Sequence, residues 1–155
     1  MIADSKFSKP ACCTEALRQS HQKLQARLTT LAEDLLDELP CGSKVVSART
    51  ALVSFVRTEI VPSATAEEAI ARDADMSVQP LLRALPGHHR LLEVLADEIE
   101  AGSGAVATAA AVGALVLLCD ARWDGEDEAL LPALVATGMD LERLVRANSA
   151  RRLAS

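Results

Sequence analysis

Two histidines and two glutamates, His21, Glu67, His89 and Glu126, each lie in an otherwise aliphatic stretch of the chain. Ionisable side chains rarely enter an apolar core unless they are paired, hydrogen-bonded or bound to a metal. Imidazole nitrogen and carboxylate oxygen together form a donor set that suits iron(II), zinc or manganese. If the fold brings the four residues together, their chemistry is that of a metal site in the protein core.

The composition predicts one helical domain that spans residues 1–155. The residues are 50% hydrophobic, yet the chain has two phenylalanines, one tryptophan and no tyrosine. A core built from leucine, valine and alanine favours packed helices over sheets, which are enriched in aromatic and β-branched residues. A chain of this length also contains enough apolar material for a substantial core.

The charge and the apolar segments exclude several classes of partner. The formal charge is -6 and there is no basic run, so we expect neither nucleic acid nor a membrane as a partner. The apolar run from Gly104 to Cys119 is shorter than the roughly 18 to 20 residues that span a bilayer, which predicts a buried helix. The polar segment from Met1 to Pro10 lacks the apolar region of a secretory signal and predicts a cytoplasmic protein.

The four cysteines do not indicate a disulfide framework in a chain without a secretory signal, so we expect reduced thiols. Adjacent Cys12 and Cys13 could bind a soft metal or form a redox pair. The favoured interpretation is a mobile N-terminal pair without a special role.

Hydrophobic periodicity predicts two long helices in the first half of the chain. Apolar residues recur at spacings of three and four from about residue 14 to residue 39, and His21 lies in this stripe. A break at residues 40–43 precedes a second helix, expected from about 44 to 70. Pro62 lies inside that helix and predicts a local distortion.

The second half predicts two further long helices. A polar link near residues 72–78 leads to a third helix, whose first turns Pro86 and Gly87 could distort. The fourth helix is expected from about 105 to 135, with a bend at Gly125.

Short connections between long helices predict the topology. The four helices should form an antiparallel up-down-up-down four-helix bundle with its core at about residues 14–137. Beyond this core, Asp140 is expected to cap a short C-terminal helix.

The order of the four ionisable residues on successive helices resembles that of the hemerythrin-like (HHE cation-binding) family. The segment from Pro62 to Glu68 is similar to the family motif Pro-His-x-x-x-Glu-Glu on the second helix, and the segment from Glu126 to Pro132 is similar to the end of the fourth. The resemblance covers roughly residues 14–145. It implies a four-helix bundle with a non-haem di-iron centre that handles O2, peroxide, nitric oxide or iron.

The chain departs from the family pattern at two positions. Ser63 and Arg122 stand where the family has histidines on the second and fourth helices. The resemblance therefore implies that each metal of a di-iron centre would keep one protein histidine. A single metal on His21, Glu67, His89 and Glu126 is the alternative, with non-haem iron as the expected cofactor and another divalent metal, or none, as further alternatives.

Other residues lie one helical turn from these positions and are candidate replacement ligands: Glu59, Glu93 and Cys119. His88 fits an alternative apolar stripe on the third helix, while the family position and the match to the first helix favour His89. No glycine-rich phosphate loop, Ser/His/Asp order or Cys-x2-Cys pair indicates another catalytic chemistry.

A metal-free interpretation competes with the metal site. Arg122 and one protonated histidine could balance Glu67 and Glu126 in a neutral buried cluster. The protein would then be a ligand-binding or protein-interaction module on the same fold, and it could form a homodimer. The small side chain of Ser63 could also leave room in the core for a small molecule.

Overall fold

The computed structural model describes residues 8–71, 75–83, 85–139, 141–142 and 145–146, and these residues contain helices and no strand. Four long helical rods account for most of them. The protein is therefore all-α, as its composition predicts.

Two rods come from the first half of the chain. The first is α1 (Ser8–Glu38), which begins before the predicted start near residue 14. The second rod consists of α2 (Val45–Phe55), the π-helical turn η1 (Val56–Ile60) and α3 (Val61–Ala71), which run on without a break. Its bounds agree with the second predicted helix.

The second half begins with the short helix α4 (Gln79–Leu82), followed by the third rod, α5 (Leu85–Ala101). Pro86 lies in the first turn of α5, where a proline is tolerated because the N–H it lacks would have no partner within the helix.

The fourth rod consists of α6 (Ala105–Gly125), the π-helical turn η2 (Glu126–Leu130) and α7 (Leu131–Ala136). The bend expected at Gly125 is thus replaced by a π turn that begins at the next residue.

Each π turn ends two residues before a proline, Pro62 in the second rod and Pro132 in the fourth. The residue that follows each turn donates its N–H to the carbonyl five residues back. In a regular α-helix a proline ring clashes with the carbonyl four residues earlier. A single wider turn relieves such a clash while the helix continues. The distortion predicted at Pro62 is therefore a π turn, and the fourth rod uses the same device.

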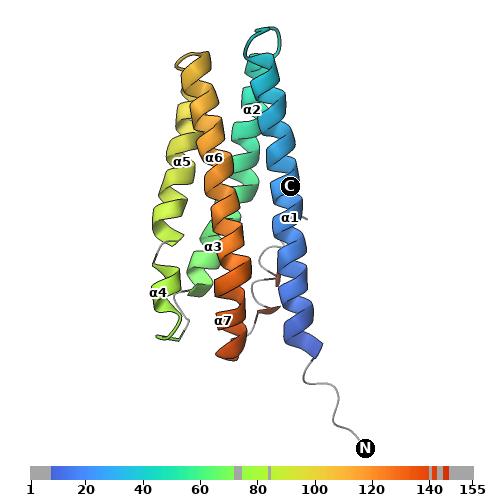
Figure 1. The fold of residues 1–155 in the computed structure, drawn as a ribbon, viewed down its shortest axis with the longest axis vertical. Helices are drawn as coiled ribbons and strands as arrows, with labels where there is room; N and C mark the ends of the chain where they lie inside the picture. The colour runs from blue at the N-terminus through green and yellow to red at the C-terminus, as the bar shows by residue number, and fades with distance from the viewer. Residues whose placement is uncertain (1–7, 72–74, 84, 140, 143–144, 147–155) are drawn as a thin grey trace, which may run out of the picture.

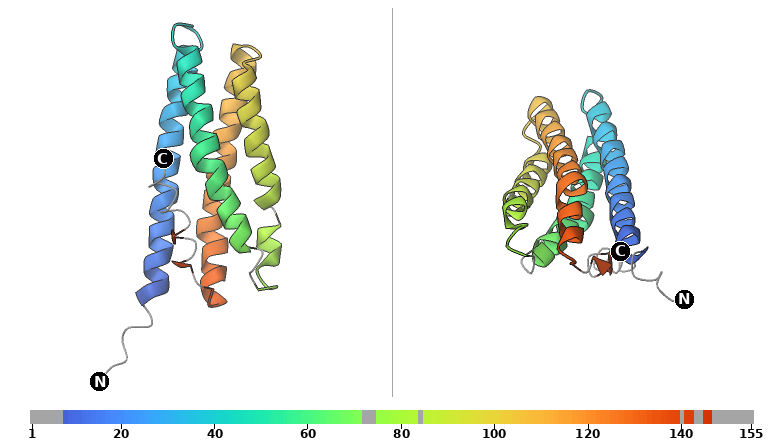
Figure 2. Two further views of the ribbon diagram at one scale, coloured as in Figure 1. Left: turned by 180° about the vertical axis from the view of Figure 1, so that it is seen from behind. Right: turned by 60° about the horizontal axis from the view of Figure 1, so that its bottom comes forward.

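The four rods lie side by side along the long axis of the molecule, as seen from the front and from behind (Figures 1 and 2). α1 packs against α2 and α6, while α5 packs against α2, α3 and α6. The connections between adjacent rods at one end are short, at residues 39–44 and 102–104. At Gly102 the positive φ of 61° favours glycine, because other residues adopt this conformation only with strain.

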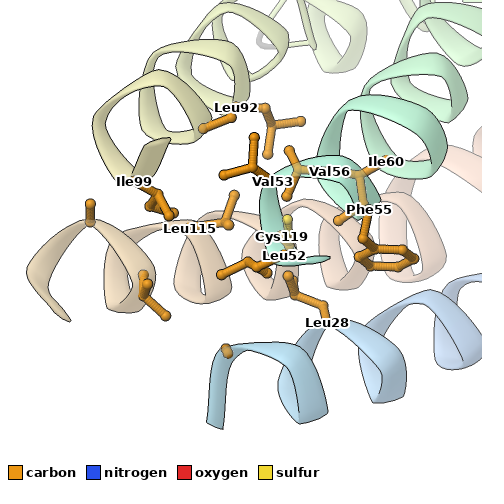
Figure 3. Packing of buried hydrophobic residues seen from close by; sticks show 14 of the residues in the cluster. Leu28, Leu52, Val53, Phe55, Val56, Ile60, Leu92, Ile99, Leu115 and Cys119 are labelled. Atoms are coloured by element: carbon orange, nitrogen blue, oxygen red, sulfur yellow. The ribbon is translucent and has the colours of Figure 1, made fainter. Parts of the chain in front are cut away.

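The largest apolar cluster draws on all four rods (Figure 3). Leu28, Leu52, Leu92 and Leu115 come from one rod each and are completely buried. A second, smaller cluster includes Leu17, Leu85, Leu130, Leu131 and Leu141. The two clusters leave a layer between them, into which the second rod also extends beyond Ala64 of the larger cluster.

Parts of the predicted C-terminal region lie outside the described residues. Leu141 is buried and Val145 packs against the second cluster. The predicted cap at Asp140 and most of the helix expected after it lie outside the described residues, as does part of the link at residues 72–78.

By length and composition, one helix in the described part of the chain is apolar enough to cross a membrane, the continuous helix Ala105–Ala136. The core helix of a soluble protein passes the same test. This helix packs against α1 and α5. It carries Leu115 of the larger cluster, and 33% of its most apolar stretch is buried.

Two leucines two residues apart on α6 test this packing. Leu115 has no exposed surface, whereas Leu117 is 71% exposed. Leu115→Ala should lower the free energy of unfolding by about 3 kcal/mol because it leaves a cavity in the core. Leu117→Ala should change it by less than about 0.5 kcal/mol. Urea unfolding followed by circular dichroism measures both, and equal losses would contradict this orientation of α6.

Candidate metal centre

An ionisable layer lies between the two apolar clusters. On α1, His21 lies between Leu17 of the smaller cluster and Leu24 of the larger one. In the fourth rod Glu126 occupies the same kind of position, between Trp123 and Leu130. Helical spacing places each ionisable residue one turn from its apolar neighbours and on the same face.

Three side chains converge in this layer. His21, Glu67 and Glu126 are all buried, and each offers one ligand atom within 4.8 Å of the other two. His21 Nε2 is 3.5 Å from Glu126 Oε2 and 3.8 Å from Glu67 Oε1. Three of the four residues predicted from the sequence are therefore together.

Arg122 bridges the two carboxylates from the other side. Its Nε donates to Glu126 Oε1 at 2.6 Å, and its Nη2 donates to Glu67 Oε2. Each carboxylate thus uses one oxygen for the guanidinium. The second oxygen of each, Glu67 Oε1 and Glu126 Oε2, is the one nearest to His21.

Asp127 orients the imidazole ring. Its Oδ1 lies 2.9 Å from His21 Nδ1, and because a carboxylate accepts hydrogen bonds, Nδ1 carries the donated proton. Nε2 is then directed toward the two glutamates. A carboxylate behind a histidine is the arrangement that orients histidine ligands in metal sites. Trp123 stacks on the same ring, with centroids 6.3 Å apart, and Ser63 Oγ donates to Glu67 Oε1 at 3.0 Å.

Two atoms of the cluster are orphaned. His21 Nε2 and Glu126 Oε2 are buried, and neither finds a hydrogen-bond partner in the described part of the chain. A buried polar atom without a partner costs free energy. A cation placed among these two atoms and Glu67 Oε1 would satisfy both.

The surroundings strongly change the protonation of His21. Burial lowers the pKa of this histidine, but the nearby carboxylate of Glu67 and the charges of Glu126 and Asp127 outweigh burial and raise the pKa to about 9. Without a metal, His21 is therefore a cation at neutral pH.

The two glutamates are shifted in opposite directions. For Glu126, burial and repulsion by Glu67 outweigh the attraction of Arg122 and His21 and raise the pKa to about 7. For Glu67, burial is opposed more strongly by His21, Arg122 and Ser63, which lower the pKa of this carboxyl. Environments that separate the pKa values of two neighbouring carboxyls are typical of functional sites.

His89 does not join the cluster, contrary to the expectation from the sequence. Its Nδ1 lies 3.4 Å from Glu68 Oε2 and its Nε2 lies 3.7 Å from Glu93 Oε1. The ring also approaches Thr65 of α3. Helical spacing puts His89 on the same stripe of α5 as buried Leu85 and Leu92, but its ring faces Glu68 of α3 and not the cluster.

His88 is the histidine of α5 that lies near the charges of the cluster. Its Nδ1 is buried and has no hydrogen-bond partner among the described residues. Burial and the charge of Arg122 lower the pKa of His88. The buried residues Leu82 and Ala96 match the stripe that includes His89, whereas Leu81 of the alternative stripe is exposed, so apolar burial alone does not explain why His88 lies nearer to Arg122.

The three proposed replacement ligands are not in the cluster. Glu59 lies in η1 and is half-buried, and Glu93 is exposed beside His89. Cys119 packs within the larger apolar cluster, where burial raises the pKa of the thiol to about 12. A thiol in this environment stays protonated and is a poor metal ligand.

The donor set fits one metal ion and does not fit two. Arg122 occupies the space on the side of the carboxylates opposite His21, and Ser63 offers no imidazole. The guanidinium would repel a second metal at that point. On the other side, the two orphaned atoms and Glu67 Oε1 provide three ligands for a single ion.

Asp127 and Trp123 were not among the site residues expected from the sequence. Asp127 directly follows Glu126, and adjacent residues in a regular α-helix do not share a face. Both residues contact His21 from opposite ends of the junction between α6 and η2. The proline that follows η2 was the available signal, since it indicates a local change of helical register.

Comparison with protein-family models, with curated proteins and with solved structures found no match to this chain.

The raised pKa of His21 predicts that the metal-free protein loses stability at alkaline pH. The folded state keeps the proton to about pH 9, whereas the unfolded chain loses it near 6.5. The contribution of His21 is thus fully present below pH 6.5 and is lost as the pH rises through 9, a change on the order of 3 kcal/mol. Urea unfolding in EDTA, measured from pH 7 to 9.5, should show this loss. His21→Gln should flatten the profile over this range, and equal slopes in both proteins would contradict the shift.

Proposed function

We propose that this chain is a hemerythrin-like metal-binding protein whose core holds one non-haem metal ion, with iron as the candidate that the family resemblance favours. The observation that carries the proposal is a pair of buried atoms without a hydrogen-bond partner among the described residues, His21 Nε2 and Glu126 Oε2, which lie beside Glu67 Oε1. The proposed ligands are His21, Glu67 and Glu126.

The proposal includes the topology of the family, an antiparallel up-down-up-down bundle. The short connections at residues 39–44 and 102–104 support it, because rods joined by a few residues must reverse direction. The contacts of α1 with α2, and of α5 with α6, agree with neighbours in such an order.

Charge supports a divalent ion at this point. Without a metal, and with Glu67, Glu126 and Asp127 all ionised, protonated His21 and Arg122 leave the sum at one negative charge. Exchange of the His21 proton for a divalent ion brings the sum to zero, a less costly state for buried charges. Protonation of Glu126, whose pKa is raised to about 7, also brings it to zero, so the ion competes with protons for this cluster.

The ligand count leaves room for a small molecule. Three protein ligands do not complete the coordination of iron, zinc or manganese. A metal in this site would supply open positions for O2, peroxide or nitric oxide, and Arg122 would supply a fixed positive charge beside them. We propose a cytoplasmic protein that needs no nucleic acid or membrane for this role.

Substitution of His21 and of His89 distinguishes the proposed metal site from the nearby ion pairs of His89. His21→Gln should lower the affinity for Fe(II) at least tenfold because it removes one of three ligands. His89→Gln is the matched control and should bind metal as the unchanged protein does, since His89 pairs with Glu68 and Glu93. Metal per chain, measured by elemental mass spectrometry on tag-free protein from iron-supplemented medium, should be about one. Binding that survives in the double variant Glu67→Ala, Glu126→Ala would rule out the site.

The second candidate function is that of a metal-free module. The contact of Arg122 with both Glu67 and Glu126 favours it. The guanidinium already neutralises Glu67 and Glu126, as a metal would. On this alternative the fold serves as a ligand-binding or interaction module, with a homodimer as one form. Metal content near zero in the unchanged protein would favour this candidate over the first.

Replacement of the guanidinium tests whether it excludes a second metal. Arg122→His removes the fixed charge and restores an imidazole at a position where the family has one. The variant should bind more iron per chain than the unchanged protein and develop near-ultraviolet absorption typical of oxo-bridged iron. Iron content equal to that of the unchanged protein would contradict an excluding role for Arg122.

A further inference from the structure

The π turn η2 receives a side-chain hydrogen bond from another rod. Arg18 of α1 donates from Nη2 to the main-chain oxygen of Asp127 at 3.1 Å, and the contact is partly buried. Several threonines bind carbonyls of their own helix, but here the donor comes from a different rod, although helix carbonyls normally have a backbone donor.

The geometry of η2 explains why this carbonyl needs a donor. The N–H of Leu131 donates to the carbonyl of Glu126, five residues back. In the same register the next donor would be residue 132, and its acceptor would be Asp127. Residue 132 is a proline and has no N–H. The Asp127 carbonyl is therefore the acceptor that Pro132 leaves without a donor, and Arg18 binds it.

We infer that Arg18 is a positioning residue that replaces the missing proline donor and thereby holds η2 in register with α1. The same turn presents Glu126 to the cluster and Asp127 to the imidazole. Arg18 and His21 lie three residues apart on one face of α1, so that α1 binds both the backbone and the side chain of Asp127. Loss of the hydrogen bond from Arg18 to the Asp127 carbonyl would let η2 shift. The contact between the Asp127 carboxylate and His21 would then be misaligned.

The other π turn provides an internal comparison. In η1 the proline is Pro62, and the corresponding carbonyl is that of Arg57. Arg57 is an exposed residue, so water can supply the donor. The carbonyl in η2 lies against α1 instead, where a protein donor takes the place of water.

The effect of Arg18 on metal affinity rests on the proposed function, whereas its effect on η2 does not. The experiment therefore measures stability without metal and metal affinity separately. The variants are Arg18→Met, which keeps the bulk and loses the donors, Arg18→Lys, which keeps a donor and the charge, and Pro132→Ala, which restores the backbone N–H. Lys23→Met, an exposed cation on the same helix, is the matched control for charge.

In EDTA, Arg18→Met should lower the urea midpoint relative to Lys23→Met, and Arg18→Lys should recover part of the loss. The emission of Trp123, the single tryptophan, should also shift in the folded Arg18→Met protein because its stacking partner His21 loses its alignment. In the Pro132→Ala background the same Arg18→Met substitution should have less than half its effect on the midpoint. This coupling is specific to the missing N–H and would not arise from loss of a surface charge.

Two results would overturn the inference: equal midpoints for Arg18→Met and Lys23→Met, or a loss that is unchanged in the Pro132→Ala background. Fe(II) titration followed by Trp123 fluorescence forms the second arm. There Arg18→Met should weaken binding about tenfold, the scale of losses when residues that orient ligands are removed. If the unchanged protein binds no Fe(II), the proposed function fails. The comparison of urea midpoints with and without Pro132→Ala still decides the role of Arg18.

Discussion

The burial of charge between two apolar clusters is the constraint on which the rest of the site depends. His21, Glu67, Arg122 and Glu126 are all removed from water, and a buried charge is tolerated only when its neighbours compensate it. The compensation here is shared, since one guanidinium contacts both carboxylates. The pKa of His21 rises to about 9 because the protonated ring is the second cation that the two glutamates require.

This charge balance links the two candidate functions. Arg122 satisfies one oxygen of each carboxylate, and the other two oxygens face His21. The two carboxylates thus offer positions for two cations. Arg122 occupies one position, and the other can take the proton of His21 or, on the proposed function, a metal ion. On the proposed function, a proton and a metal ion would compete for His21 Nε2.

Much of the fold and part of the site could be predicted from local sequence patterns. Apolar spacing located the second and fourth rods within a few residues, and it placed His21, Glu67 and Glu126 on inward faces. His89 lies on the predicted stripe of α5, but its ring pairs with Glu68 and Glu93 instead of joining them. The direction of that side chain depends on the contacts of α5 with α3 and α6, which no property of the helix alone contains.

The sequence by itself determined an all-helical chain with buried ionisable residues, because helical periodicity and the solvation of charge act through near neighbours. Only the tertiary structure decided that Arg122 spans Glu67 and Glu126, that Asp127 orients His21, and that Arg18 binds the carbonyl left by Pro132. Except for that of Arg122 with Glu126, these contacts join residues on different rods. They depend on the register between rods and on a π turn that changes which side chains share a face, and both are set by the packing of the whole molecule.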